Sequence, residues 1–178
     1  MSVDIVVCGH LTLDMIPNIQ MLTPDNLADA GKLFEIGTMA MSTGGAVSNT
    51  GLALHKLGID VCLMGLVGDD WIGNVIRDFL QQHDPSLTDH IQIISSASSA
   101  YTIVVEPQNH DRTLLTHTGI NPLFGLDTLD LEVIQQAKIF HLGYPTLLPR
   151  LYQNDGDELL RIFQTVKQAS SCITSLDM

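Results

Sequence analysis

Short hydrophobic segments rich in β-branched residues alternate along this chain with longer segments of helical periodicity. The short segments have the length and composition of buried strands, and they are residues 5–8, 61–67, 139–142 and 172–176. The longer segments repeat hydrophobic residues three or four positions apart, and they are residues 47–57, 71–80 and 159–166. This alternation predicts a three-layer α/β fold, in which a parallel sheet carries helices on both faces.

Two regions interrupt the alternation. Residues 15–41 contain no convincing long helix, and their last part, 32–41, is compatible with extended chain. Residues 101–106 and 113–116 are strand-like and flank the polar segment 108–112, which is typical of a hairpin with a longer loop. Antiparallel strands inserted into an α/β chain predict a small second sheet that stands off the main domain.

The composition narrows the class of protein. The chain has 178 residues, of which 45% are hydrophobic and 16% charged, as expected of one folded domain with a real core. Eight Lys and Arg against 20 Asp and Glu give a formal net charge of -12, which argues against binding to nucleic acid. No apolar run approaches the roughly 20 residues that span a bilayer. The chain begins without a charged leader, so we expect a cytoplasmic protein without membrane contact.

The three cysteines are predicted to be reduced core residues. Cys8, Cys62 and Cys172 are far apart and odd in number, and each lies in an apolar strand-like run. The seven histidines are also scattered along the chain. No group of His, Cys and Asp has the short spacing of a structural zinc site, so no metal site is predicted.

The strongest local feature is a glycine pair that leads into the first predicted helix, in the segment 42–49. Gly44 and Gly45 allow close approach of the backbone to a ligand, and the free amides of a helix start suit anionic or hydroxyl-rich ligands. Asn49 adds a side-chain donor and acceptor one turn later. The alternative is an ordinary glycine turn in which Thr43 or Ser48 caps the helix.

A second candidate is Asp14, just after the first predicted strand. Ligands of parallel α/β sheets bind outside the carboxyl ends of the strands. A carboxylate at that edge can accept charge-assisted hydrogen bonds from two neighbouring hydroxyls of a sugar. Taken alone, Asp14 is better explained as a residue of a surface turn or a helix cap.

Several other site motifs are absent or have simpler explanations. The pair Gly31-Lys32 is followed by Leu33 rather than by the Ser or Thr of a Walker loop. The first predicted strand is followed by a single glycine, not by the spaced glycines of a dinucleotide site. The pair Asp69-Asp70 is best explained by one of the two capping the helix that follows, rather than by metal ligation.

Together these motifs resemble the ribokinase-like (PfkB) family of carbohydrate and nucleoside kinases. Five segments match the family in order along the chain. They are residues 9–14 (first strand and substrate-binding Asp), 44–49 (Gly-Gly-x-x-x-Asn), 66–73 (Val-Gly-x-Asp-x-x-Gly), 111–113 with 118–121 (the Arg of a lid strand and the Gly-Ala-Asn that follows), and 139–143 with 175–177 (the later strands). One such match carries little information, whereas five in order are specific.

The resemblance implies an incomplete ribokinase-like domain over residues 1–178, with a β lid inserted at approximately 14–41 and 101–118. The substrate would lie between the Rossmann-like domain and the lid. Its hydroxyls would contact a set of substrate-binding residues, namely Asp14, Gly44, Gly45, Asn49 and Thr12. Arg112 would either reach the substrate or order the lid, with the second role favoured. A homodimer through the lid is also expected to be possible.

The resemblance further implies ATP-dependent phosphorylation of a sugar hydroxyl, with Mg²⁺ as the divalent cation. The catalytic Asp of the family lies in an Asp-Thr-x-Gly-Ala-Gly-Asp signature, which these 178 residues do not contain. We therefore expect the catalytic base and the carboxyl half of the domain beyond Met178, and no activity from this chain alone. The alternatives are a non-catalytic sugar- or nucleoside-binding protein and a nucleoside kinase of the same family.

Overall fold

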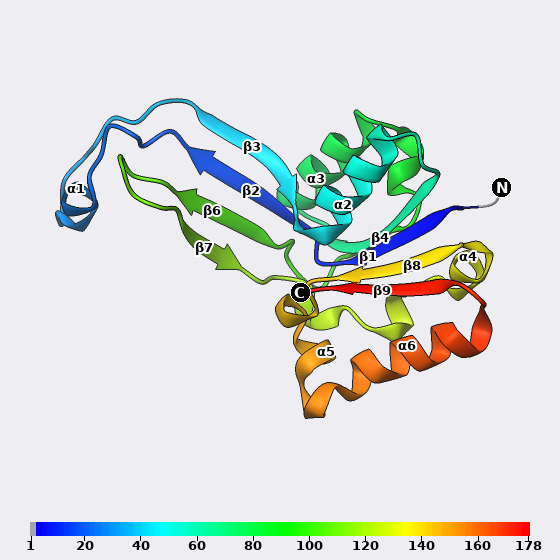
Figure 1. The fold of residues 1–178 in the computed structure, drawn as a ribbon. Helices are drawn as coiled ribbons and strands as arrows, with labels where there is room; N and C mark the ends of the chain where they lie inside the picture. The colour runs from blue at the N-terminus through cyan, green and yellow to red at the C-terminus, as the bar shows by residue number, and fades with distance from the viewer. Residues whose placement is uncertain (1–2) are drawn as a thin grey trace.

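Two β-sheets organise the chain in the computed structural model, which describes residues 3–178 (Figure 1). The larger sheet has five strands in the order β5-β4-β1-β8-β9, and all neighbouring strands are parallel. They are β1 (Ile5–Gly9), β4 (Val61–Gly68), β5 (Ile91–Ile94), β8 (Ile139–Gly143) and β9 (Ile173–Asp177). The predicted parallel sheet is confirmed, and β5 is a short edge strand that the hydrophobic pattern did not reveal.

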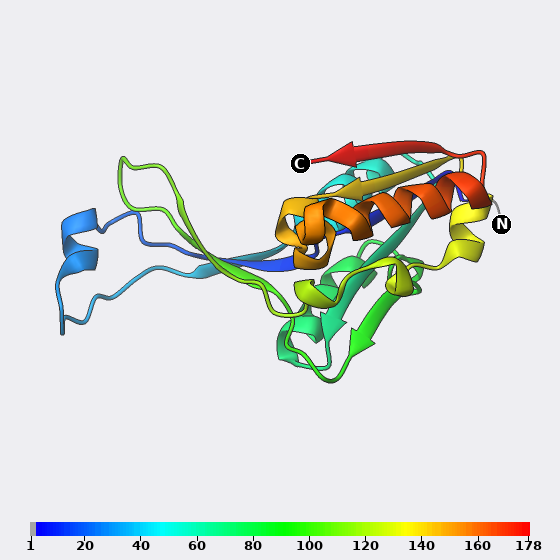
Figure 2. The ribbon, with the colours of Figure 1, turned by 90° about the horizontal axis from the view of Figure 1, so that it is seen from below.

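Helices cover both faces of this sheet (Figures 1 and 2). On one face lie α2 (Gly45–Lys56) and α3 (Trp71–Gln81), and on the other lie α4 (Leu131–Gln136), α5 (Pro149–Tyr152) and α6 (Asp157–Ala169). Short 3₁₀ helices occupy connections, namely η1 (Pro85–Thr88), η2 (Asn121–Leu123), η3 (Leu126–Thr128), η4 (Pro145–Leu147) and η5 (Asn154–Gly156). Within residues 3–178, no helix is both long and apolar enough to cross a membrane.

The alternation of side chains along the central strands produces two separate cores. Val7 of β1 packs with Val47 of α2 and Ile76 of α3 on one face. Val6, its neighbour, points to the other face and joins the core that contains Ile162 of α6. Successive residues of a strand point to opposite faces, so a continuous apolar strand needs cover on both sides. This arrangement confirms the predicted three-layer α/β fold.

The second sheet, which we call the lid sheet, has the strand order β3-β2-β6-β7. Its strands are β2 (Thr12–Pro17), β3 (Met39–Gly44), β6 (Tyr101–Val105) and β7 (Thr113–His117). It projects from the parallel sheet as a long arm whose far end carries α1 (Pro24–Ala28) (Figures 1 and 2). The predicted hairpin is the antiparallel pair β6 and β7. The expected extended chain over 32–41 forms a strand only from Met39 onward.

Both ends of α2 carry a glycine in the left-handed conformation, with φ of +83° at Gly45 and +81° at Gly58. A Cβ atom added at Gly45 would lie 2.7 Å from the backbone carbonyl carbon of His10, whereas one added at Gly58 would meet nothing within 4 Å. No side chain caps α2, so the alternative of a Thr43 or Ser48 cap is wrong. The hydroxyls of those two residues contact each other instead.

This pair of glycines allows a matched test of the crowding at the start of α2. We expect Gly58→Ala to lower the free energy of unfolding by about 1–2 kcal/mol, the cost of a left-handed conformation for a residue with a Cβ. Gly45→Ala adds the overlap with His10 and should cost about 3 kcal/mol or more. Urea denaturation of both variants measures the difference. Equal losses would show that the start of α2 is not tightly packed.

Candidate functional site

Asp14 lies on β2 at the base of the lid sheet, where the chain has just left the parallel sheet. In the ladder between β2 and β3, Thr12 is opposite Gly44 and Asp14 is opposite Ser42. Since alternate residues of a strand share a face, these four residues lie on one face of the lid sheet. A Cβ atom added at Gly44 would lie 2.8 Å from Cγ of Asp14. The glycine therefore makes room for the carboxylate.

The charge state of Asp14 is set by two opposing effects. Asp14 is partly buried, and burial raises the pKa of its carboxyl above the ordinary value of 3.8. The positive charge of Arg112 acts in the opposite direction and lowers that pKa, but burial dominates. The structure thus brings the charge of Arg112, an exposed residue at the far end of the hairpin, within electrostatic reach of Asp14.

Thr12 contributes a buried polar group to the same face. Its side chain is 3% exposed, and its hydroxyl oxygen has no hydrogen-bond partner. A buried hydroxyl without a partner costs about 1–3 kcal/mol, and such groups in native proteins call for an explanation. Thr12 is two residues from Asp14 on β2, so its buried, unpaired hydroxyl lies on the same face of the lid sheet as the Asp14 carboxylate.

Asn49 lies one turn inside α2 and is exposed. Together with Ser42 and other residues of α2 and α3, it lines a shallow pocket of about 360 Å³ that does not include Asp14. Ser42 connects this pocket to Asp14, because it lines the pocket and is also the cross-strand partner of Asp14. The structure therefore groups Thr12, Asp14 and Gly44 closely and places Asn49 on an adjoining surface.

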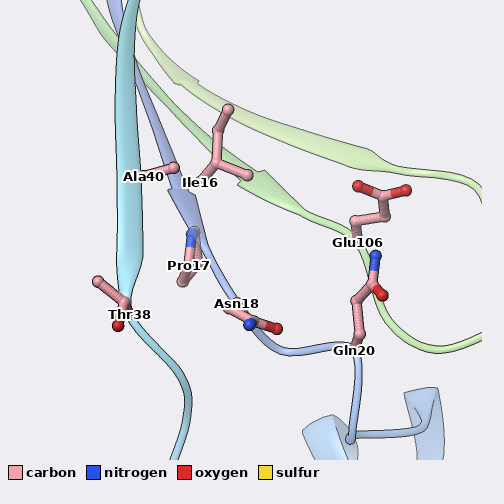
Figure 3. Close-up of a pocket in the computed structure, with 7 residues that line it drawn as sticks. All are labelled: Ile16, Pro17, Asn18, Gln20, Thr38, Ala40 and Glu106. Atoms are coloured by element: carbon pink, nitrogen blue, oxygen red, sulfur yellow. The ribbon is translucent and has the colours of Figure 1, made fainter.

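A second pocket of about 350 Å³ lies further out along the lid sheet (Figure 3). Its lining residues come from β2, β3 and the neighbouring loops, and they are Ile16, Pro17, Asn18, Gln20, Thr38, Ala40 and Glu106. None of them belongs to the set that the sequence predicted. Its one charged side chain, Glu106, is exposed, and we leave this pocket outside the candidate site.

A buried polar pair beside the site was missed by the sequence analysis. His10 and Asn121 are each 3% exposed, and Nδ1 of His10 accepts a hydrogen bond from Nδ2 of Asn121 at 3.1 Å. Burial lowers the pKa of His10, and the hydrogen bond from Asn121 opposes that shift only in part. The imidazole is therefore neutral near pH 7. The pair spans 111 residues of sequence, so no local pattern could have revealed it.

The side chains within residues 3–178 offer no cluster for a metal ion. No group of three or more His, Cys, Asp or Glu residues is arranged to hold one within that range. All three cysteines are free and buried, as predicted. Burial, the largest effect, raises the pKa of Cys62 to about 12, so its thiol is unreactive at neutral pH.

Curated relatives of this chain are named as sugar kinases, and the chain matches only part of their length. Over 146 residues the chain is 29% identical to a probable fructokinase-4 from Arabidopsis thaliana, a match that covers 81% of the chain and 42% of the relative. It is 27% identical over 140 residues to an ATP-dependent ribose-1-phosphate kinase from Halopiger xanaduensis, covering 79% of the chain and 45% of the relative. The matched region thus spans less than half the length of these relatives.

Solved structures show the same fold. Arabidopsis thaliana ribokinase complexed with ribose and ATP matches the whole chain and 54% of its own chain, with a TM-score of 0.77 and 20% identity. Fructokinase with bound ATP from Xylella fastidiosa also matches the whole chain and 52% of its own, with a TM-score of 0.73 and 20% identity. The sequence model of the pfkB family carbohydrate kinases matches residues 3–177. The chain therefore belongs to the PfkB family of carbohydrate kinases.

Proposed function

We propose that this chain is the sugar-binding part of an ATP-dependent PfkB kinase and that it binds a sugar at the base of the lid sheet. The observation that carries the proposal is the Asp14 carboxylate, partly buried and packed against Gly44 directly before α2. Ionised, it can accept hydrogen bonds from two adjacent hydroxyls. Thr12 adds its unpaired hydroxyl on the same face.

The electrostatics of this site favour a neutral, hydroxyl-rich ligand over an anionic one. A helix start taken alone attracts phosphate. Here the carboxylate of Asp14 lies against Gly44, the residue directly before α2, and its negative charge opposes an anion at that position. Relatives named as fructokinases support a neutral sugar as the ligand.

ATP and Mg²⁺ would supply the phosphoryl group and neutralise its developing charge. The residues of this chain do not fit them. The Asp-Thr-x-Gly-Ala-Gly-Asp signature is absent from the sequence, and residues 3–178 contain no cluster of three or more metal-ligating side chains. We therefore assign no step of phosphoryl transfer to this chain and propose that it binds the sugar without phosphorylating it.

Titration calorimetry with D-fructose and with D-ribose tests this proposal. We expect one of the two sugars to bind the chain and Asp14→Asn to weaken that binding about ten-fold or more, because hydrogen bonds to a charged group are each worth roughly 1.5–3 kcal/mol. Asp29→Asn, a change to an exposed carboxylate beside α1 at the far end of the lid, is the matched control and should bind normally.

Two results would contradict the proposal. Unchanged affinity of Asp14→Asn for a sugar that the unmodified chain binds would remove Asp14 from the site. Robust sugar-dependent ATP turnover by the unmodified chain would show that it contains catalytic residues that we have not assigned.

The opposing effects on Asp14 predict a pH dependence of sugar binding. Burial raises the pKa of Asp14 above 3.8. As the pH is lowered, the carboxylate should therefore become protonated before the pH reaches 3.8, and the affinity for the sugar should fall with it. Arg112→Gln removes the charge that lowers this pKa, so the midpoint of the loss should move to higher pH. Affinity measured across the acidic range for this variant and for Lys56→Gln, a control in the Asn49 pocket, provides the comparison. An unmoved midpoint in Arg112→Gln would exclude the electrostatic coupling.

A further inference from the structure

The chain crosses between the two sheets four times: after β1, after β3, before β6 and after β7 (Figure 1). The position of Asp14 therefore depends on how these crossings are held. The third crossing, just before β6, is held by a side chain at the start of one of the helices that cover the parallel sheet. That side chain is Asp70, the residue directly before α3.

Asp70 makes two kinds of hydrogen bond at once. Its Oδ1 accepts from the backbone N–H of Gly73 at 2.7 Å, which caps α3. The same oxygen accepts from the hydroxyl of Ser99 at 2.8 Å, and Oδ2 accepts from the backbone N–H of Ser99 at 2.7 Å. The Ser99 hydroxyl oxygen in turn accepts from the N–H of Gly68 at 2.8 Å. Ser99 is thus held by both its backbone and its side chain.

The packing around Asp70 and Ser99 leaves no space for side chains at the two neighbouring glycines. Ser99 is completely buried. A Cβ atom added at Gly68 would lie 2.8 Å from the backbone nitrogen of Ser99, and one added at Gly73 would lie 2.8 Å from its hydroxyl oxygen. Real Cβ atoms do not approach other atoms so closely, so the two glycines permit the contact between Asp70 and Ser99.

Ser99 connects directly to the strand that carries Asp14. The next residue, Ala100, accepts a hydrogen bond through its carbonyl from the N–H of Leu13 at 3.2 Å. The strand β6 begins immediately afterwards, and its Thr102 is opposite Asp14 in the parallel ladder between β2 and β6. The position of Ser99 therefore sets where β6 starts, and β6 supports β2 on the side away from β3.

Helix capping alone does not explain Asp70. Asp84 and Asp130 also precede helices, and the hydrogen bonds that they accept come from residues two or three positions ahead. Asp130 in addition lies 3.4 Å from the ring of His90. Asp70 bonds in addition to a residue 29 positions away. Burial acts to raise the pKa of Asp70, but hydrogen bonds led by those from Gly73 and Ser99 outweigh it and lower that pKa. The carboxylate is therefore ionised at neutral pH, which strengthens its hydrogen bonds.

We propose that Asp70 is a positioning residue: together with Ser99 it forms a clamp that fixes the base of the lid sheet and thereby the place of Asp14. The clamp determines how firmly the base of the lid sheet is held, and this does not depend on any ligand. Its consequence for ligand binding rests on the proposed function, in which Asp14 holds the sugar.

Hydrogen–deuterium exchange of the sugar-free chain tests the clamp through Asp70→Ser and Ser99→Ala. Serine is a good helix cap, but it has one side-chain oxygen and is too short to hold Ser99 as Asp70 does. Loss of hydrogen bonds to a charged group should accelerate exchange in residues 12–17 and 101–105 about ten-fold or more. Asp130→Ser, which alters the cap of α4 and the contact of Asp130 with His90, is the matched control and should leave the lid sheet unchanged.

The outcomes separate the clamp from the proposed function. Exchange in 12–17 and 101–105 at the unmodified rate in both variants overturns the clamp, whatever happens to sugar binding. Should Asp70→Ser fail to fold, Ser99→Ala alone decides, because it retains the cap of α3. Accelerated exchange combined with normal fructose and ribose binding by Asp14→Asn would support the clamp and reject the sugar site. Accelerated exchange with a parallel loss of sugar affinity in Ser99→Ala supports both.

Discussion

The candidate site depends on close backbone packing where the chain passes between its two sheets. At Gly44 the missing side chain admits the carboxylate of Asp14, and at Gly45 a left-handed turn places α2 against the backbone of His10. A larger residue at either position would push β3 and α2 away from β2. The site is therefore built by backbone geometry first, and the polar side chains act within the space that this geometry leaves.

Hydrophobic periodicity was sufficient to predict the parallel sheet and its two helical layers, because buried strands and amphipathic helices leave strong patterns. It failed for β2, in which Thr12 and Asp14 alternate with Leu13 and Met15 only over a short stretch that resembles a loop. The link between Asp14 and the glycine pair came from resemblance to a family. The contact between Asp70 and Ser99 had no sequence signal. Ser99 lies 29 positions from Asp70, in a run of small residues that are mostly serine.

The structure also clarifies how the parts of the candidate site relate to each other. Thr12, Asp14 and Gly44 share one face of the lid sheet, whereas Asn49 lies on an adjoining surface connected through Ser42. The charge of Arg112 acts on the pKa of Asp14 from the far end of the hairpin, and its role in ordering the lid or reaching the substrate stays a prediction. In a chain of the PfkB family whose matches cover less than half of its curated relatives, these are the groups that we propose hold the sugar.

The central claim, that a sugar binds at the base of the lid sheet, is tested most directly by amide NMR of the ¹⁵N-labelled chain during separate titrations with D-fructose and D-ribose. The account predicts that the largest shifts with one of these sugars occur at Asp14, Gly44 and Gly45, with a smaller change at Asn49. Largest shifts around the outer pocket of Figure 3, or no shifts with either sugar, would contradict it.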